Sequence, residues 1–212
     1  MADRAAPERW GRPRTAGTAR LEAFSDGVIA IVVTLLVFEL RLPEGSPDDL
    51  GTALVELTPK LASFALSFVT VAIFWVNHHH FFDRVQHSDW PLLWLNNHLL
   101  FWLALVPFTT GLLGDHIDEP LAVALYAANL GMGAAAFVGI NQYALFASEL
   151  VDSSISLAVR RNERRRAVLG VVSFSVGAAL AYVWLPAALV LIGAIPLAYV
   201  VPNLLAGDEA TP

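Results

Sequence analysis

Six runs of about twenty mostly apolar residues occupy most of the chain, and an α-helix needs a run of about this length to cross the hydrocarbon core of a bilayer. The runs cover residues 22–40, 59–80, 91–113, 120–148, 167–184 and 186–205. Pro59, Pro91 and Pro120 each stand at the start of a run. A helix tolerates proline there because its first N–H groups have no intrahelical partner. The sequence therefore predicts an all-α, polytopic membrane protein with six transmembrane helices.

The composition agrees with this class. Of the 212 residues, 56% are hydrophobic and 15% are charged, and the mean hydropathy is +0.58, above the usual balance of a soluble domain. The chain contains no cysteine, which excludes disulfides, thiolate catalysis and cysteine-based metal sites. We expect a mobile basic arm over residues 1–18, one transmembrane domain over 19–206 and a short tail over 207–212.

The charged residues outside the runs indicate the orientation. Arginines gather in the N-terminal arm and again between the fourth and fifth runs, at Arg160, Arg161, Arg164, Arg165 and Arg166. The loops that follow the first and third runs are acidic. Because basic flanks stay on the cytoplasmic side, we predict a multi-pass protein of the cell membrane with both termini in the cytoplasm. We interpret the five arginines mainly as a topology determinant, with a lipid-headgroup site as the alternative.

The first run contains a carboxylate, Asp26, next to Ser25. A charged side chain inside a membrane span costs about 2.5 to 3.5 kcal/mol on insertion scales, so it needs a partner. The second run ends in His78, His79 and His80, and the third begins with Asn96 and Asn97. We predict that Ser25, Asp26, one or more of these histidines and Asn97 form a hydrogen-bonded network at the cytoplasmic end. A metal site is the less favoured interpretation, because three successive histidines on a helix point in different directions.

A helical projection of the first run gives one apolar stripe, opposite to Asp26. Its members are Phe24, Val28, Ile31, Leu35 and Phe38, with Thr34 at the edge and Glu39 near the outer end. Such a stripe is commonly in contact with lipid or with the protein core. Glu39 would attract cations at an outer mouth or would be an ordinary solvated charge.

Arg20, Phe24, Ser25 and Asp26 match the R-x-x-x-F-S-D signature of the transmembrane protein 175 family of potassium channels, which the chain resembles. The run G-V-x-A-I-x-x-T-L-L-V follows at Gly27 to Val37. Phe74-Trp75 with His78-His79, and Trp94-Leu95-Asn96-Asn97, are similar to the second and third helices of that family. The resemblance is strong in the first half of the chain and extends to the layout of the second half.

The resemblance implies a potassium-selective or potassium-preferring channel whose first helices line the pore. Ile31 would then form the narrowest ring, Leu35 and Phe38 further apolar layers, and Thr34 a layer that favours K⁺ over Na⁺. Single-repeat members are homotetramers, and this chain contains one copy of the signature. The implied partners are membrane lipids and permeant monovalent cations, with K⁺ in the pore, no other cofactor and no nucleic acid.

Three alternatives remain open from the residues. A secondary transporter would have broken helices at the midplane. A proton-permeable cation channel would use the Asp26 and histidine cluster. An intramembrane enzyme would need a nucleophile beside those histidines, and no recognisable hydrolase motif accompanies them.

Overall fold

The computed structural model describes residues 17–42, 49–151 and 156–206, with side chains up to residue 198 apart from that of residue 147. The described residues are helical except for loops and one isolated β-bridge between Val85 and Val151. Most of the predicted arm, 1–16, and the predicted tail, 207–212, lie outside the described residues.

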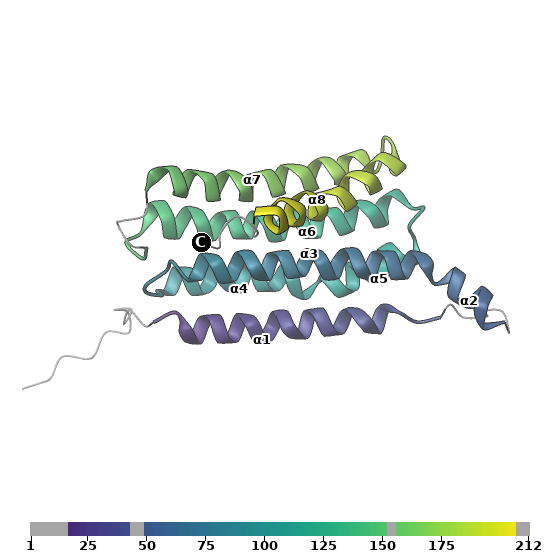
Figure 1. The fold of residues 1–212 in the computed structure, drawn as a ribbon, viewed down its shortest axis with the longest axis horizontal. Helices are drawn as coiled ribbons and strands as arrows, with labels where there is room; N and C mark the ends of the chain where they lie inside the picture. The colour runs from purple at the N-terminus through teal and green to yellow at the C-terminus, as the bar shows by residue number, and fades with distance from the viewer. Residues whose placement is uncertain (1–16, 43–48, 152–155, 207–212) are drawn as a thin grey trace, which may run out of the picture.

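The helices lie side by side in layers (Figure 1). Helix α1 (Ala19–Leu35), continued by a 3₁₀ turn at Leu36–Glu39, forms one outer layer. It packs on α3 (Thr58–Phe82), α4 (Trp90–Ala104) and α5 (Val106–Asp115). Helix α6 (Pro120–Gln142) follows, and α7 (Leu157–Leu180) with α8 (Leu185–Ala206) closes the far side. A short α2 (Leu50–Glu56) precedes α3.

Proline residues stand at the helix starts, as predicted, and an aspartate cap that was not predicted adds to them. Proline occupies one of the first two positions of α3, α4 and α6, at Pro59, Pro91 and Pro120. Asp89 caps α4 by accepting a hydrogen bond from the Leu92 amide at 3.0 Å. An N-cap acceptor of this kind satisfies one of the amides that the first turn leaves unpaired.

The third run is a single span with an interruption. Helix α4 ends at Ala104 and α5 begins at Val106, with Pro107 in the first turn of α5. Proline lacks the N–H that would continue the α4 hydrogen-bond ladder, which explains the break. Together α4 and α5 cover Trp90–Asp115 and remain long and apolar enough to cross a membrane.

Four spans pass the test of length and hydropathy in the described part of the chain: Ala19–Glu39, Thr58–Phe82, Trp90–Asp115 and Pro120–Phe146. The protein is therefore a membrane protein. The fifth run differs from the expectation, because α7 begins ten residues earlier and carries the five arginines on its first turns. Arginine is a good helix former, and Ser156 caps the extended helix by accepting from the Val159 amide.

Small residues let α6, α7 and α8 approach closely. Gly131 of α6 faces Phe174 of α7, and Gly170 of α7 faces Ala134 of α6. A Cβ atom at Gly177 would lie 2.9 Å from a side-chain carbon of Ile192 on α8, closer than two carbons pack. Helix α6, with fully buried Tyr126, Leu130 and Ile140, is the centre of the core.

Candidate pore-lining helix and its supporting network

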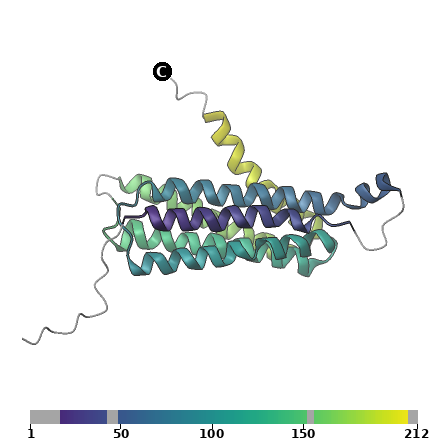
Figure 2. The same cartoon turned by 90° about the horizontal axis from the view of Figure 1, so that it is seen from below.

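Helix α1 presents two different faces. Leu21, Ser25, Ile29, Val32 and Leu36 are buried against α3, α4 and α5. The other face is apolar and uncovered: Phe24 is 57% exposed, Ile31 59%, Leu35 42% and Phe38 61%. Figure 2 views the molecule from this side and shows α1 in front of the bundle. A large apolar surface of this kind marks a contact with lipid or with another chain.

Thr34 lies on the exposed face of α1, beside this stripe. Its hydroxyl donates a hydrogen bond to the carbonyl of Ile31 at 2.9 Å. A threonine hydroxyl has one proton and two lone pairs. The proton is therefore used within the helix, and the oxygen can still accept a cation or a water proton.

Glu39 ends the 3₁₀ turn and is half-buried. Its carboxylate lies against the backbone of Gly111 on α5, where an added Cβ atom would come within 2.1 Å of the Glu39 Oε2 atom. Glycine is the residue that leaves room for this close approach. The carboxylate predicted for an outer mouth thus contacts the next helices of its own chain.

Asp26 finds its donor on α3. The indole Nε1–H of Trp75 donates to the Oδ1 atom of Asp26 at 2.9 Å. The Trp75 ring stacks on His79, with ring centroids 5.8 Å apart and planes inclined by 13°. The sequence indicated a histidine or asparagine donor and missed Trp75, although an indole N–H is a donor only and suits a carboxylate well.

A second hydrogen-bonded group joins α1, α3 and α4 in the interior. The Nδ2 group of Asn96 donates to the Ser25 Oγ atom at 2.9 Å, and the Asn96 Oδ1 atom lies 2.9 Å from the His78 Nε2 atom. Ser25 donates in turn to the Leu21 carbonyl. All three side chains are at most 1% exposed, so each is satisfied by the others.

The predicted network is therefore corrected in two respects. Asn96 takes the position expected of Asn97, which points outward and is exposed because it lies one residue, about 100°, further around α4. Asp26 does not join His78 but pairs with Trp75 at the edge of the helix contact. Arg20 and Phe24, the other signature residues, are exposed on the first turns of α1.

The end of the bundle opposite to the start of α1 carries a polar contact that the sequence did not indicate. Lys60, at the start of α3, donates to the carbonyl of Arg41 at 3.2 Å and forms an ion pair with Asp115 at 2.7 Å. The chain after α1 and the end of α5 are thus held to α3. Within residues 17–42, 49–151 and 156–206, no three His, Asp or Glu side chains converge as a metal site would require.

Comparison with known proteins identifies the family to which the chain belongs. Residues 20–107 match the sequence profile of a family described as "Endosomal/lysosomal potassium channel TMEM175". A protein named potassium channel from Streptomyces collinus is 33% identical over 187 residues, which are 86% of this chain and 91% of that one. The chain belongs to the TMEM175 family. Members are ion channels, and the chain is therefore a channel protein and not an enzyme.

Two further comparisons extend the TMEM175 assignment. A protein named potassium channel from Chryseobacterium sp. (strain P1-3) is 44% identical over 118 residues, which are 56% of this chain but only 60% of that protein. The crystal structure of a TMEM175 homologue from Chamaesiphon minutus, described as a lysosomal potassium-selective channel homologue, superposes with a TM-score of 0.78 at 27% identity. The superposition covers 87% of this chain and 97% of the other, so the helical arrangement is that of a TMEM175 channel.

Proposed function

We propose that four copies of this chain form a potassium channel whose pore is lined by the exposed face of α1. The observation that carries the proposal is the division of α1 into a face buried in its own bundle and an uncovered face containing Ile31, Leu35 and Phe38. Closed symmetry around one axis would bring four such faces together. The relatives named as potassium channels support K⁺ as the permeant ion.

Ile31 would form the constriction in this arrangement. It lies in the C-terminal half of α1 and is 59% exposed in the single chain. A ring of isoleucine side chains offers no ligand to a dehydrated cation, so it controls conduction by excluding water. Leu35 and Phe38, one and two turns further toward the outer end, would add two apolar layers.

Selectivity in such a pore needs oxygen ligands, and Thr34 is the exposed residue on this face that offers them. The hydroxyl proton is held by the Ile31 carbonyl at 2.9 Å, which turns the oxygen lone pairs away from the helix backbone. Four such oxygens could replace part of the water shell of K⁺. Glu39 is a weaker candidate for the mouth, because its carboxylate lies against Gly111.

Two polar contacts would hold α1 in place against its neighbours, and the apolar stripe alone would line the ion path. The first contact is the pair of Asp26 with Trp75, and the second is the buried group of Ser25, Asn96 and His78. A carboxylate that accepts from Trp75 at 2.9 Å and a histidine that is 1% exposed are both already engaged. The transporter alternative would require a break in the helix that lines the path. The third span is interrupted between α4 and α5, but α1, which carries the uncovered face, is continuous from Ala19 to Leu35.

We further propose six spans, cytoplasmic termini and a location in the cell membrane. The fifth and sixth spans would be the apolar part of α7 and helix α8, which follow each other through a short turn at residues 181–184. The arginines at the start of α7 lie at the same end of the bundle as the start of α1, where the positive-inside rule requires them (Figure 1).

The test is K⁺ flux into liposomes that contain purified Ile31→Asn protein. A polar side chain of similar size should make the constriction easier to wet and raise the flux several-fold. Met132→Asn is the matched control, since Met132 is an exposed apolar residue in the middle of α6. Equal flux in the parent protein, the Ile31 variant and the control, in assemblies of unchanged size, would contradict the proposal.

A further inference from the structure

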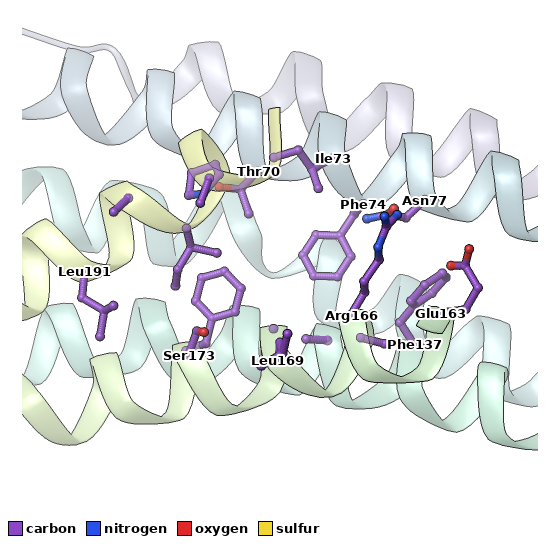
Figure 3. Close-up of a pocket in the computed structure, with 18 residues that line it drawn as sticks. Thr70, Ile73, Phe74, Asn77, Phe137, Glu163, Arg166, Leu169, Ser173 and Leu191 are labelled. Carbon is purple, nitrogen blue, oxygen red and sulfur yellow. The ribbon is translucent and has the colours of Figure 1, made fainter. Parts of the chain in front are cut away.

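A cavity of about 560 Å³ lies between α3, α6, α7 and α8, on the side of the bundle away from α1 (Figure 3). This volume falls within the range of roughly 300 to 1,000 Å³ that small-molecule pockets occupy. The cavity belongs to neither the exposed face of α1 nor the Ser25 network, and the proposed pore does not use it.

The cavity has an apolar body and a polar rim. Aromatic and aliphatic side chains form most of its wall, including Phe74, Phe137 and Leu191. Figure 3 shows Asn77, Glu163 and Arg166 gathered at one end, with Leu191 at the other. An elongated apolar space with polar groups at one end suits a molecule with a hydrocarbon chain and a polar head.

The rim carries a net positive charge. Glu163 already forms an ion pair with Arg84, at 2.9 Å between Oε1 and Nη1. Arg166 reaches across the rim from α7 toward α3 in Figure 3. An anionic head group is therefore favoured over a cationic one.

The cavity is also open to its surroundings. Leu169, which lines it from α7, is 53% exposed, and Ala194, which lines it from α8, is exposed as well. Figure 2 shows α8 leaving the bundle at an angle. An apolar opening between the spans of a membrane protein faces acyl chains and not water.

We propose that this cavity binds an anionic phospholipid, with one acyl chain against Phe74 and Phe137 and the phosphate at Arg166. The inference takes from the proposed function only the cytoplasmic position of the arginine-bearing end. A head group at that end lies at the cytoplasmic interface, where anionic lipids and juxtamembrane arginines meet.

Native mass spectrometry of the full chain in mild detergent tests this proposal. The assembly is titrated with phosphatidylglycerol and with phosphatidylcholine of the same acyl chains, and bound lipids are counted. The parent protein should retain phosphatidylglycerol preferentially. Arg166→Gln should weaken phosphatidylglycerol binding about fivefold, since one basic residue near a charged surface contributes about 1 kcal/mol, whereas Arg165→Gln, which is not part of the wall, should change it little.

A second pair of variants tests the acyl-chain part of the site. Ala194→Trp fills the cavity from α8 and should remove the binding of both lipids, whereas Leu197→Trp, at an exposed position outside the wall, should not. Equal binding of the two lipids, or binding unchanged by both Arg166→Gln and Ala194→Trp in assemblies of the parent mass, would overturn the proposal. K⁺ flux of the same variants reconstituted into liposomes reports on the pore alone, so the two proposals fail separately.

Discussion

The indole nitrogen of Trp75 on α3 lies 2.9 Å from a carboxylate oxygen of Asp26 on α1. This contact ties the N-terminal half of the candidate pore helix to the helix behind it. It also gives the carboxylate of an apolar segment the donor that its insertion requires.

Trp75→Phe should therefore destabilise the protein by about 1 to 3 kcal/mol, because the hydrogen bond from the indole N–H to the Asp26 carboxylate is lost. Thermal unfolding, followed by size-exclusion chromatography of heated samples, measures the change. Trp94→Phe is the control, since Trp94 is an exposed tryptophan of α4. If both variants unfold at the parent temperature, the Asp26 contact does not stabilise the assembly.

Asn96→Leu should cost a similar amount, about 1 to 3 kcal/mol, since His78 and Ser25 would remain buried with one partner fewer. Asn97→Leu should stay within about 0.5 kcal/mol of the parent, because Asn97 is exposed and lies outside this network. The same heating assay compares the two neighbours. A larger loss in the Asn97 variant would restore the assignment made from the sequence.

The sequence predicted the features that depend on the period of the apolar residues and on the positions of proline. Pro59, Pro91 and Pro120 start helices where expected, and Ile31, Leu35 and Phe38 share an exposed face. It assigned Asn97 to the network where the structure has Asn96, because a difference of one residue turns a side chain by about 100° and the choice depends on how α4 packs against α1. The Asp26 donor was missed for a similar reason, since Trp75 reaches Asp26 only after α1 has packed against α3.

Other features depend on contacts distant in sequence and have no local signal. Lys60 meets both the Arg41 carbonyl and Asp115 only after α1, α3 and α5 have assembled. The contact of the Glu39 carboxylate with Gly111 likewise forms only when the 3₁₀ turn after α1 packs against α5.

The proposed topology predicts which residues a thiol reagent can reach from each side of the membrane. The chain has no cysteine, so a single introduced one is a specific label. Asp118→Cys, in the α5–α6 loop, should react with a membrane-impermeant thiol reagent added outside intact cells. Arg161→Cys, at the start of α7, should react only after the cells are opened. The reverse pattern would invert the orientation.

Ion preference should depend on the Thr34 oxygen. Thr34→Ala should lower the K⁺/Na⁺ permeability ratio several-fold while leaving conduction intact, because it removes the oxygen ligand and keeps the helix. Thr34→Ser retains a hydroxyl and should stay close to the parent. Reversal potentials under bi-ionic conditions measure the ratio, and an Ala variant as selective as the Ser variant would exclude Thr34 from the selectivity layer.

The central claim, that the exposed face of α1 lines the pore, is tested most directly by blocking that face. Leu35→Cys channels in a planar bilayer are exposed to a charged thiol reagent while K⁺ current is recorded, with Met132→Cys on α6 as the matched exposed position. The account predicts loss of most of the current in the Leu35 variant and an unchanged current in the Met132 variant. Complete modification of Leu35→Cys with undiminished current, in intact tetramers, would contradict it.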